Sequence, residues 1–386
     1  MRRRILHLHN YSNWGGNLAH LRLVLAGLAG DPDRELFLAA PPQEGYLERF
    51  RGLGVGLLPF EARSRSDVRA VWRLVRLVRS HGIDLVHSHL RRTDWICAWS
   101  RLLCPGRVWV TTVHGEVNLG PDYRRRRGLR SAVYGRVLAR FDRVLAVSED
   151  LARRLALEEG VRTDRLTAIA NGVAILPPSL PSPEERQVAR RSLGIPEGAP
   201  TLLTMGRFGR RKGHEVLLRA AAREAAQGRP WEILLLGDGD LESGCRALAG
   251  ELGLGARARF HGFQADTLPF LLAAEVLVAP SHSEGLPRAL LEGMVAGLAP
   301  VASDIGGVRE ALEAPRFGLT FPAGDDGALA AHLSRLRFSP DLRRTLGERA
   351  RARILERYSA SRMVEQHRRL YDELLRGRSE RRRHRH

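Results

Sequence analysis

The chain contains 386 residues, of which 44% are hydrophobic and 27% are charged. Because this length is about two and a half times that of a typical domain, we expect two domains. The composition excludes a disordered or collagen-like chain. The longest nearly apolar stretch, residues 268–280, contains Pro269 and Glu275 and is too short to cross a bilayer as a helix.

The formal net charge of +19 is distributed unevenly along the chain. Residues 1–176 carry +12, residues 177–375 carry +2, and residues 376–386 carry +5. The last segment has almost no apolar residue, so we predict a basic, disordered tail at 377–386. Aromatic residues make up only 6% of the chain and no known nucleic-acid-binding module occurs, so we expect no nucleic-acid partner and keep such binding as a remote alternative.

We expect no signal peptide in the first residues, because His7 and His9 interrupt the short apolar run that follows the basic start. Three cysteines without a C-x-x-C pair indicate neither a disulfide framework nor a structural zinc site. We expect a cytoplasmic protein. The positive charge leaves open a peripheral association with the inner face of the plasma membrane, or a mere coding bias toward arginine.

Short apolar runs rich in β-branched residues alternate with amphipathic segments along the whole chain, a pattern typical of parallel sheets covered by helices. In the first half we predict strands at Ile5–His9, Glu35–Ala39, Val55–Pro59, Leu85–His87, Val108–Val113, Arg143–Val147 and Thr167–Ala170. In the second half we predict strands at Thr201–Met205, Glu232–Leu236, Ala258–His261, Val276–Ala279, Ala299–Ala302 and Gly318–Phe321. The segment from about residue 341 to 376 is predicted to form two helices with a break near Tyr358.

Residues 177–183 (PPSLPSP) form a stiff, polar segment that suits a domain boundary. We predict a Rossmann-like domain over 1–178, joined by a C-terminal helix at about 358–376, and a second Rossmann-like domain over 184–357. Ligands of such doubly wound sheets bind beyond the carboxyl ends of the strands, so two α/β domains suggest a site in a cleft between them.

One lysine stands out, because Lys212 is the only Lys among 62 Lys and Arg residues. It lies in the glycine-rich segment 206–213 (GRFGRRKG), between a predicted strand and a predicted helix. Backbone N–H groups and the helix dipole favour an anion at such a position, and an ammonium group reaches a phosphate as a slim point charge. A diphosphate would fit this loop, although a plain surface turn is the alternative.

Two further glycine-containing turns follow predicted strands, at Gly237 and at Gly306-Gly307. Both are also explained by turn chemistry alone. The D-x-D triplets at Asp31–Asp33 and Asp238–Asp240 resemble turns more than metal ligands, so we expect no metal.

The segment 281–294 (SHSEGLPRALLEGM) is the most specific one. Glu284 follows a predicted strand, Pro287 starts a predicted helix, and Glu292 lies in that helix among apolar residues. A carboxylate in apolar surroundings needs strong partners, and two hydroxyls of a sugar could supply them. An ordinary exposed glutamate is the alternative.

In order and spacing, Gly206-Arg207…Lys212-Gly213, Glu284 and Glu292, and Gly306-Gly307…Glu310 resemble the retaining family-4 glycosyltransferases of the GT-B fold. The resemblance extends over essentially the whole chain, including Gly15-Gly16, Val86-His87-Ser88-His89, Thr112-Val113-His114-Gly115 and Asn171-Gly172-Val173. The family usually has Asp after Asn-Gly-Val, where this chain has Ala174.

The resemblance implies two Rossmann-like domains that face a central cleft, with the C-terminal helix packing back across the hinge. It implies transfer of a sugar from a nucleotide diphosphate sugar to an acceptor hydroxyl, with retention and without a cofactor or metal. By position, Arg207 and Lys212 would neutralise the diphosphate, Glu292 would hold the ribose, and Glu284 would hold the donor sugar. His114 would contact the sugar, Gly15 and Gly16 would approach the distal phosphate, and further donor contacts would come from Gly206, Gly237, Phe263, Gly285, Leu286, Gly306 and Gly307.

A GT-B-like epimerase or phosphorylase is the alternative enzyme. The acceptor would be a glycan or a lipid-linked glycan, as in assembly of bacterial lipopolysaccharide, exopolysaccharide or glycolipid. The cation run Tyr123–Arg130 would face the acceptor or a membrane. The amphipathic segment Asp67–Ser80 is explained better by packing against a sheet than by a membrane-surface helix.

Overall fold

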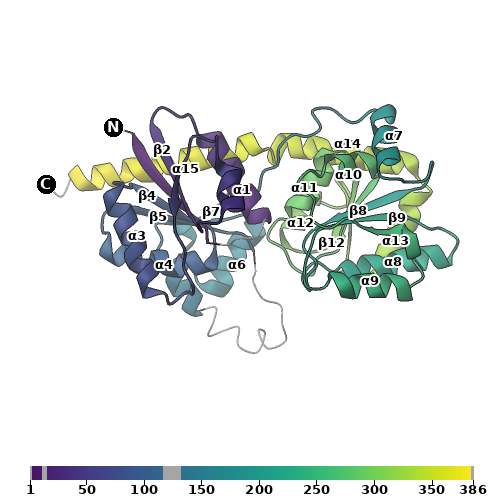
Figure 1. Ribbon diagram of the computed structural model, residues 1–386, viewed down its shortest axis with the longest axis horizontal. Coiled ribbons are helices and arrows are strands. Elements are labelled where there is room, and N and C mark those ends of the chain that lie inside the picture. The colour runs from purple at the N-terminus through teal and green to yellow at the C-terminus, as the bar shows by residue number, and fades with distance from the viewer. Residues whose placement is uncertain (1, 11–14, 116–131, 384–386) are drawn as a thin grey trace. The chain divides into compact units, whose positions relative to one another are not determined.

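The computed structural model describes residues 2–10, 15–115 and 132–383 (Figure 1). The chain divides into two compact units, each with its own core. The first unit comprises Met1–Asn171 together with Ala360–His386, and the second comprises Gly172–Ser359. The chain thus changes unit at Asn171, a few residues before the proline-rich segment 177–183.

The first unit is built on a parallel sheet of seven strands in the order β3-β2-β1-β4-β5-β6-β7. The strands are β1 (Arg3–Leu8), β2 (Arg34–Ala40), β3 (Gly56–Pro59), β4 (Leu85–Ser88), β5 (Val108–Val113), β6 (Arg143–Ala146) and β7 (Leu166–Ala168). The helices are α1 (Gly16–Leu28), α2 (Glu44–Leu47), α3 (Val68–Ser80), α4 (Arg91–Leu103), α6 (Glu149–Glu159) and α15 (Ala360–Arg383), with short 3₁₀ turns at Glu48–Phe50 and Thr163–Arg165.

The core of the first unit joins the sheet to α1 and α15. Buried side chains of α1, such as Leu21 and Val24, and of α15, such as Tyr371, pack with alternate residues of the central strands. Gly27 allows the two helices to approach closely, because a Cβ there would lie 2.6 Å from a methyl carbon of Val364. The segment after the second domain therefore completes the core of the first, as the sequence predicted.

The second unit contains a parallel sheet of six strands in the order β10-β9-β8-β11-β12-β13. The strands are β8 (Thr201–Met205), β9 (Glu232–Leu236), β10 (Ala258–Phe260), β11 (Val276–Ala279), β12 (Ala299–Ser303) and β13 (Leu319–Phe321). The helices are α7 (Pro183–Ser192), α8 (His214–Ala226), α9 (Glu242–Glu251), α10 (Leu268–Ala273), α11 (Arg288–Val295), α12 (Gly306–Leu312), α13 (Asp326–Arg337) and α14 (Pro340–Arg357), with a 3₁₀ turn at Gly255–Arg257. Figure 1 shows helices on both faces of each sheet.

The proline-rich segment 177–183 is fastened to the second unit at both of its ends. The buried guanidinium of Arg351 donates to the carbonyl oxygens of Pro177 and Pro178 at 2.9 and 2.8 Å. At the other end, Ser182 and Glu185 form a capping box that starts α7: the amide of Glu185 donates to the Ser182 hydroxyl, and the amide of Ser182 donates to the Glu185 carboxylate.

Every predicted strand is present in the structure, most of them within one residue of the expected bounds at each end. The break between the last two helices is also confirmed, because α14 ends at Arg357 and α15 begins at Ala360. None of the described helices has both the length and the low charge needed to cross a membrane.

The prediction of a disordered tail over 377–386 is wrong for its described part, because α15 continues through Arg383. Arginine is a good helix former, and a helix that is already nucleated extends at little cost. Arg378 also anchors the extension to the first unit, since its guanidinium donates to the backbone carbonyl of Asp84 at 2.9 Å.

Candidate active site

The predicted donor-site segments of the second unit follow neighbouring strands. The loops that contain Lys212, Gly237, Glu284 and Gly306 begin at the carboxyl ends of β8, β9, β11 and β12, which are adjacent in the sheet. Parallel strands place their carboxyl ends at one edge, so the fold brings these four loops to the same edge of the sheet. Segments separated by about a hundred residues thereby form one group.

The glycine-rich loop after β8 is folded back on itself in a way that requires glycine. Gly206 has a φ of +154° and its amide donates to the carbonyl of Leu236 at 2.9 Å. Gly213 has a φ of +62°, and a Cβ there would collide with the carbonyl oxygen of Pro280. The amide of Lys212 donates to the carbonyl of Gly209 at 2.9 Å, so the lysine lies in a tight turn just before α8.

Lys212 and Glu284 form the central contact of this edge. The Lys212 ammonium Nζ lies 2.6 Å from Glu284 Oε1, and the Glu284 side chain is only 10% exposed. A guanidinium nitrogen of Arg211 lies 3.7 Å from the other carboxylate oxygen, and the Ser281 hydroxyl donates to Oε1 at 3.4 Å. A carboxylate this little exposed is stabilised by two cations and one hydroxyl, which holds the side chains of both predicted donor-binding loops together.

Glu292 has a partner that the sequence analysis did not identify. The guanidinium of Arg288, one turn earlier on α11, lies 3.0 Å from Glu292 Oε1, and it also donates to the carbonyl of Gly172 at 2.7 Å. The Glu292 side chain keeps 30% of its surface exposed, so it can still accept hydrogen bonds from a ligand. The i,i+4 spacing of the two residues was the available signal. Pro287, predicted as the first helical residue, is the N-cap of α11.

The remaining predicted donor contacts lie around this group. Gly237 has a φ of +137°, and its amide donates to the carbonyl of Gly262, next to the exposed Phe263 ring. Gly285 and Leu286 are buried directly after Glu284. Gly306 and Gly307 are the first residues of α12.

Arg207 points to the acidic turn after β9. Its guanidinium lies 3.4 Å from the carboxylate of Asp240, which is 90% exposed. An ion pair this exposed is weak and can be exchanged for a ligand phosphate. The other D-x-D triplet, at Asp31–Asp33, is a local turn in which the Asp31 carboxylate accepts from the amide of Asp33 at 3.1 Å.

In the first unit, the predicted residues lie at the corresponding edge of the other sheet. His114 follows β5 and is half-buried, with its ring 4.9 Å from the ring of His20. Gly15 is the N-cap of α1 and Gly16 is its first residue, and both are exposed. The φ of Gly15, −167°, is extended backbone open to any residue, so the backbone conformation does not explain the glycine there.

A cluster of buried histidines surrounds His114, and the sequence analysis identified it only in part. Five histidines are at most 1% exposed: His7 in β1, His20 in α1, His87 in β4, His89 directly after β4, and His367 in α15. The centroids of neighbouring imidazole rings in this cluster lie 4.2 to 6.1 Å apart. In the sequence His7 interrupts an apolar run, and its place in a buried strand is the available signal for this cluster.

Hydrogen bonds and burial keep this cluster uncharged. The His7 and His89 rings are hydrogen-bonded at 2.9 Å, and His87 bonds to the hydroxyls of Thr112 at 2.8 Å and Tyr371 at 2.5 Å. Burial lowers the pKa of His7 to about 3 and of His367 to about 4, and it places the pKa values of His87 and His89 well below their usual range.

Two sets of these histidines bring three ring nitrogens within 4.8 Å of one another: His7, His87 and His89, and His20, His89 and His114. In the first set, the close nitrogens of His7 and His89 bond to each other, and both nitrogens of His87 bond to hydroxyls. A metal ion would have to break these bonds. In the second set, His89 is already bonded to His7, and a ring nitrogen of His20 is bonded to the side-chain oxygen of Asn171 at 3.0 Å, so both sets belong to a hydrogen-bonded cluster.

Comparison with known proteins agrees with this division of the chain. Residues 14–175 match Glycosyltransferase Family 4, and residues 185–353 match Glycosyl transferases group 1. The lipopolysaccharide core biosynthesis glycosyltransferase LpsD of Rhizobium meliloti is 32% identical over 96% of this chain and 98% of its own length. LpsE of the same organism is 34% identical, but the match spans 45% of this chain and about half of that protein, 49%.

Solved structures show the same architecture. Anabaena HepE in complex with UDP-glucose superposes with a TM-score of 0.84 at 21% identity, covering 96% of this chain and 99% of that one. WaaG, a glycosyltransferase involved in lipopolysaccharide biosynthesis, superposes with a TM-score of 0.72 at 16% identity, covering 94% and 98% of the two chains. With two parallel-sheet α/β units of the GT-B class and matches over both of them, the chain belongs to the family-4, group-1 glycosyltransferases.

Proposed function

We propose that the protein is a retaining glycosyltransferase that moves a sugar from a nucleotide diphosphate sugar to an acceptor hydroxyl. The observation that carries this is the Lys212–Glu284 pair, held at 2.6 Å on the edge where the loops after β8, β9, β11 and β12 gather. A little-exposed carboxylate beside a cation cluster supplies acceptors for sugar hydroxyls and positive charge for a diphosphate. HepE, which shares the fold, has been solved in complex with UDP-glucose, in agreement with this class of donor.

In this proposal, Arg207 and Lys212 stabilise the diphosphate as its negative charge grows. Glu284 accepts hydrogen bonds from the donor sugar, and Glu292 accepts them from the ribose. The amide groups of Gly306 and Gly307 contribute at the start of α12. Electrostatic stabilisation of this kind, aimed at charge that develops in the transition state, is commonly the largest single contribution to catalysis.

The reaction proposed is a front-face displacement. The bond between the anomeric carbon and the phosphate oxygen breaks, and the acceptor oxygen bonds to the same face of that carbon. The acceptor proton passes to the leaving phosphate oxygen, so the step is balanced without an enzyme nucleophile. Side-chain cations take the place that a divalent metal has in other transferases, and His114 contacts the sugar near the reacting carbon.

We further propose that the acceptor belongs to a bacterial surface glycan and is lipid-linked. Two relatives carry names that place them in lipopolysaccharide core biosynthesis. The positive charge concentrated in residues 1–176 suits a phosphate-bearing acceptor at the inner face of the plasma membrane, where the protein would be peripheral. The cation run Tyr123–Arg130, which the sequence analysis assigned to this role, lies outside the described residues.

The decisive experiment measures nucleoside diphosphate release over a panel of UDP-, GDP- and ADP-sugars. We expect one donor to be turned over, and Lys212→Ala to lose about 10²–10³ in rate while remaining folded. Arg210→Ala, in the same loop, removes an exposed cation to which no role is assigned, and it should retain most of the activity. Wild-type turnover in a folded Lys212→Ala protein would contradict the assignment, and formation of an isomerised nucleotide sugar would identify an epimerase instead.

A further inference from the structure

The amphipathic helix α3 does not bury all of its apolar residues. Val71, Val75 and Val78 are buried in the first unit, as expected for a helix packed on a sheet. Val68 and Trp72, which lie one turn apart on the same face, are 66% and 57% exposed. Packing against the sheet therefore explains only part of the apolar stripe.

The neighbouring helix α4 exposes a second apolar pair. Trp99 is 52% exposed and Leu102 is 55% exposed. The two helices pack side by side, and the Ser100 hydroxyl donates to the carbonyl of Val71 at 3.4 Å. Trp99 is the neighbour of Ser100 in the chain, and Trp72 is the neighbour of Val71. Both tryptophans therefore lie next to the contact between the two helices. Among the described residues, these are the two tryptophans that count as exposed.

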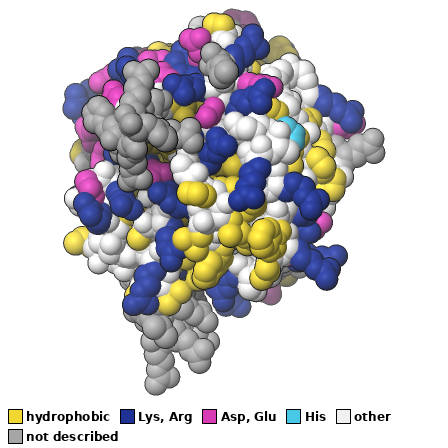
Figure 2. All heavy atoms as spheres, turned by 90° about the vertical axis from the view of Figure 1, so that its left-hand side faces the viewer, with side chains coloured by type: hydrophobic (Ala, Val, Ile, Leu, Met, Phe, Trp, Pro, Cys, Tyr) yellow, Lys and Arg dark blue, Asp and Glu magenta, His cyan; other side chains and the backbone are white. Residues whose placement is uncertain are grey.

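Arginines border these apolar side chains. α3 contains four arginines and no acidic residue, and its N-cap Asp67 is occupied by the amide of Ala70 and by Arg73. Within the described part of the chain, neither Arg69 nor Arg76 forms an ion pair. Figure 2 shows this side of the first unit, where hydrophobic side chains gather among those of Lys and Arg.

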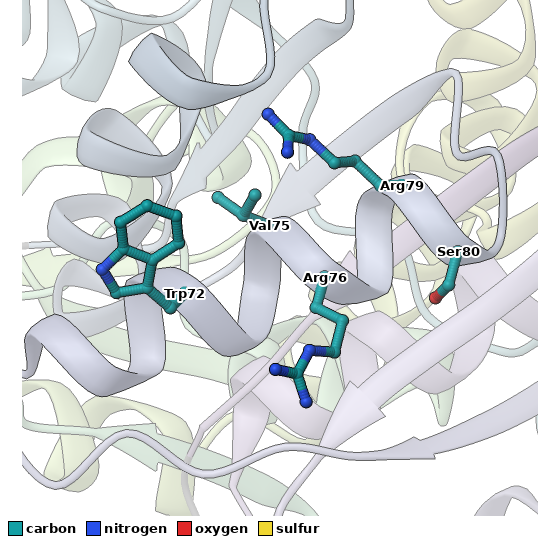
Figure 3. Close-up of a pocket in the computed structure, with 5 residues that line it drawn as sticks. All are labelled: Trp72, Val75, Arg76, Arg79 and Ser80. Atoms are coloured by element: carbon teal, nitrogen blue, oxygen red, sulfur yellow. The ribbon is translucent and has the colours of Figure 1, made fainter.

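A shallow groove runs along α3 beside Trp72. It is lined by Trp72, Val75, Arg76, Arg79 and Ser80 (Figure 3). The guanidinium groups of Arg76 and Arg79 extend to opposite sides of the helix. Val75 is buried at the bottom of the groove, and the Arg79 guanidinium donates to the carbonyl of Leu103 at 2.7 Å. The exposed indole of Trp72 and the guanidinium of Arg76 match the boundary of the acyl chains and the phosphates at a membrane interface.

We infer that the α3–α4 surface, formed by Val68, Arg69, Trp72, Arg76, Trp99 and Leu102, docks the protein on an anionic phospholipid membrane. Indole rings favour the boundary between headgroups and acyl chains, and arginines reach the phosphates with their guanidinium groups while their stems stay in apolar surroundings. This inference gives the proposed lipid-linked acceptor a place on the molecule and rests on that part of the proposed function. It adds to the sequence-based interpretation, because α3 packs against the rest of the first unit as predicted and also exposes Val68 and Trp72.

The positive charge of the α3–α4 surface favours an anionic membrane over a second copy of this chain as its partner. Two copies facing each other through this surface would bring like charges together without acidic partners, whereas an anionic bilayer neutralises them. The four exposed apolar side chains sit on two neighbouring helices, a small area compared with the interface of a stable dimer. Both considerations favour the lipid surface.

Vesicle co-sedimentation tests the inference. The full-length protein should bind phosphatidylcholine vesicles that contain phosphatidylglycerol, should release as salt rises, and should bind pure phosphatidylcholine weakly. Brominated acyl chains should quench tryptophan fluorescence, and Trp72→Phe should reduce the quenching while keeping most of the binding. Equal binding to neutral and anionic vesicles, or no quenching, would overturn the inference.

Paired variants locate the surface. Arg69→Gln with Arg76→Gln should weaken binding by about fivefold for each arginine, and Trp72→Ser with Trp99→Ser by at least about tenfold. Leu157→Ser with Arg153→Gln is the matched control, because it removes an 85% exposed leucine and an exposed arginine from α6 of the same unit. Binding lost with the control pair, or only on neutralising Arg124–Arg127, would place the membrane contact elsewhere.

Two more measurements separate this inference from the proposed function. Nucleotide affinity, and the release of nucleoside diphosphate from the donor in the presence of a water-soluble acceptor, should be unchanged in the α3–α4 variants. Donor turnover without vesicle binding would remove the docking inference alone, and vesicle binding without donor turnover would remove the proposed function alone. A dimer in sedimentation velocity that the tryptophan variants convert to a monomer would show that the surface binds a second copy instead.

Discussion

Lowering the pH should destabilise the first unit well before its carboxylates titrate, because its core contains neutral histidines. Burial lowers the pKa of His7 from 6.5 to about 3, and the pKa values of His9 and His367 from 6.5 to about 4. The unfolded chain therefore binds more protons than the folded one between about pH 6.5 and 4. The stability that depends on these groups is complete above pH 6.5 and is lost as the pH falls through this window.

The magnitude follows from one pKa unit being worth about 1.36 kcal/mol. Between pH 7 and pH 5, each of these three histidines should cost about 2 kcal/mol, or roughly 6 kcal/mol together. Whole domains are stable by about 5–15 kcal/mol, so the loss is a large share of the total. Asp94 acts in the opposite direction, because burial raises the pKa of its carboxyl group, although three hydroxyls donate to it.

Urea unfolding between pH 7 and pH 5, followed by hydrogen-exchange mass spectrometry, would measure each unit separately. The free energy of unfolding of the first unit should fall by several kcal/mol. The second unit should lose about 2 kcal/mol through His214, whose pKa burial lowers to about 4. His367→Met should make the pH dependence of the first unit shallower by about 1 kcal/mol per pH unit on average between pH 7 and pH 5. A first unit whose stability changes by less than about 1 kcal/mol over this range would refute the reasoning.

Three further outcomes can be checked on the second unit and on the whole enzyme. Glu284→Gln should mainly lower turnover, because its carboxylate is assigned to the donor sugar. Glu292→Gln should mainly weaken nucleotide binding measured by calorimetry, because its carboxylate is assigned to the ribose. Equal effects of the two substitutions would contradict these separate roles. Donor turnover should persist in EDTA, since charge stabilisation is assigned to Arg207 and Lys212, and activity that returns only with Mn²⁺ or Mg²⁺ would argue for a metal. Gly237→Ala should destabilise the second unit by about 1–3 kcal/mol in thermal or urea unfolding, because a Cβ there would collide with the carbonyl oxygen of Gly206 and φ is +137°.

Local patterns in the sequence were sufficient to predict the strands, the final helix break and the glycine-rich loop after β8. These features depend on residues close in the chain: apolar runs bounded by turns, and glycines where φ is positive. Such signals keep their meaning wherever the segment lies in the fold. The order and spacing of the loop motifs were likewise enough to indicate the family.

Side-chain partners were decided by tertiary structure. Lys212 meets Glu284 because β8 and β11 are neighbours in the sheet, and sequence spacing alone does not pair them. The histidine cluster needs β1, β4, α1 and α15 together, so His367 meets histidines that lie about 280 to 360 residues earlier in the chain, and this contact has no local signature. Trp72 stays exposed because the sheet and α4 cover only one side of α3, and hydrophobic periodicity does not say which apolar positions find a partner.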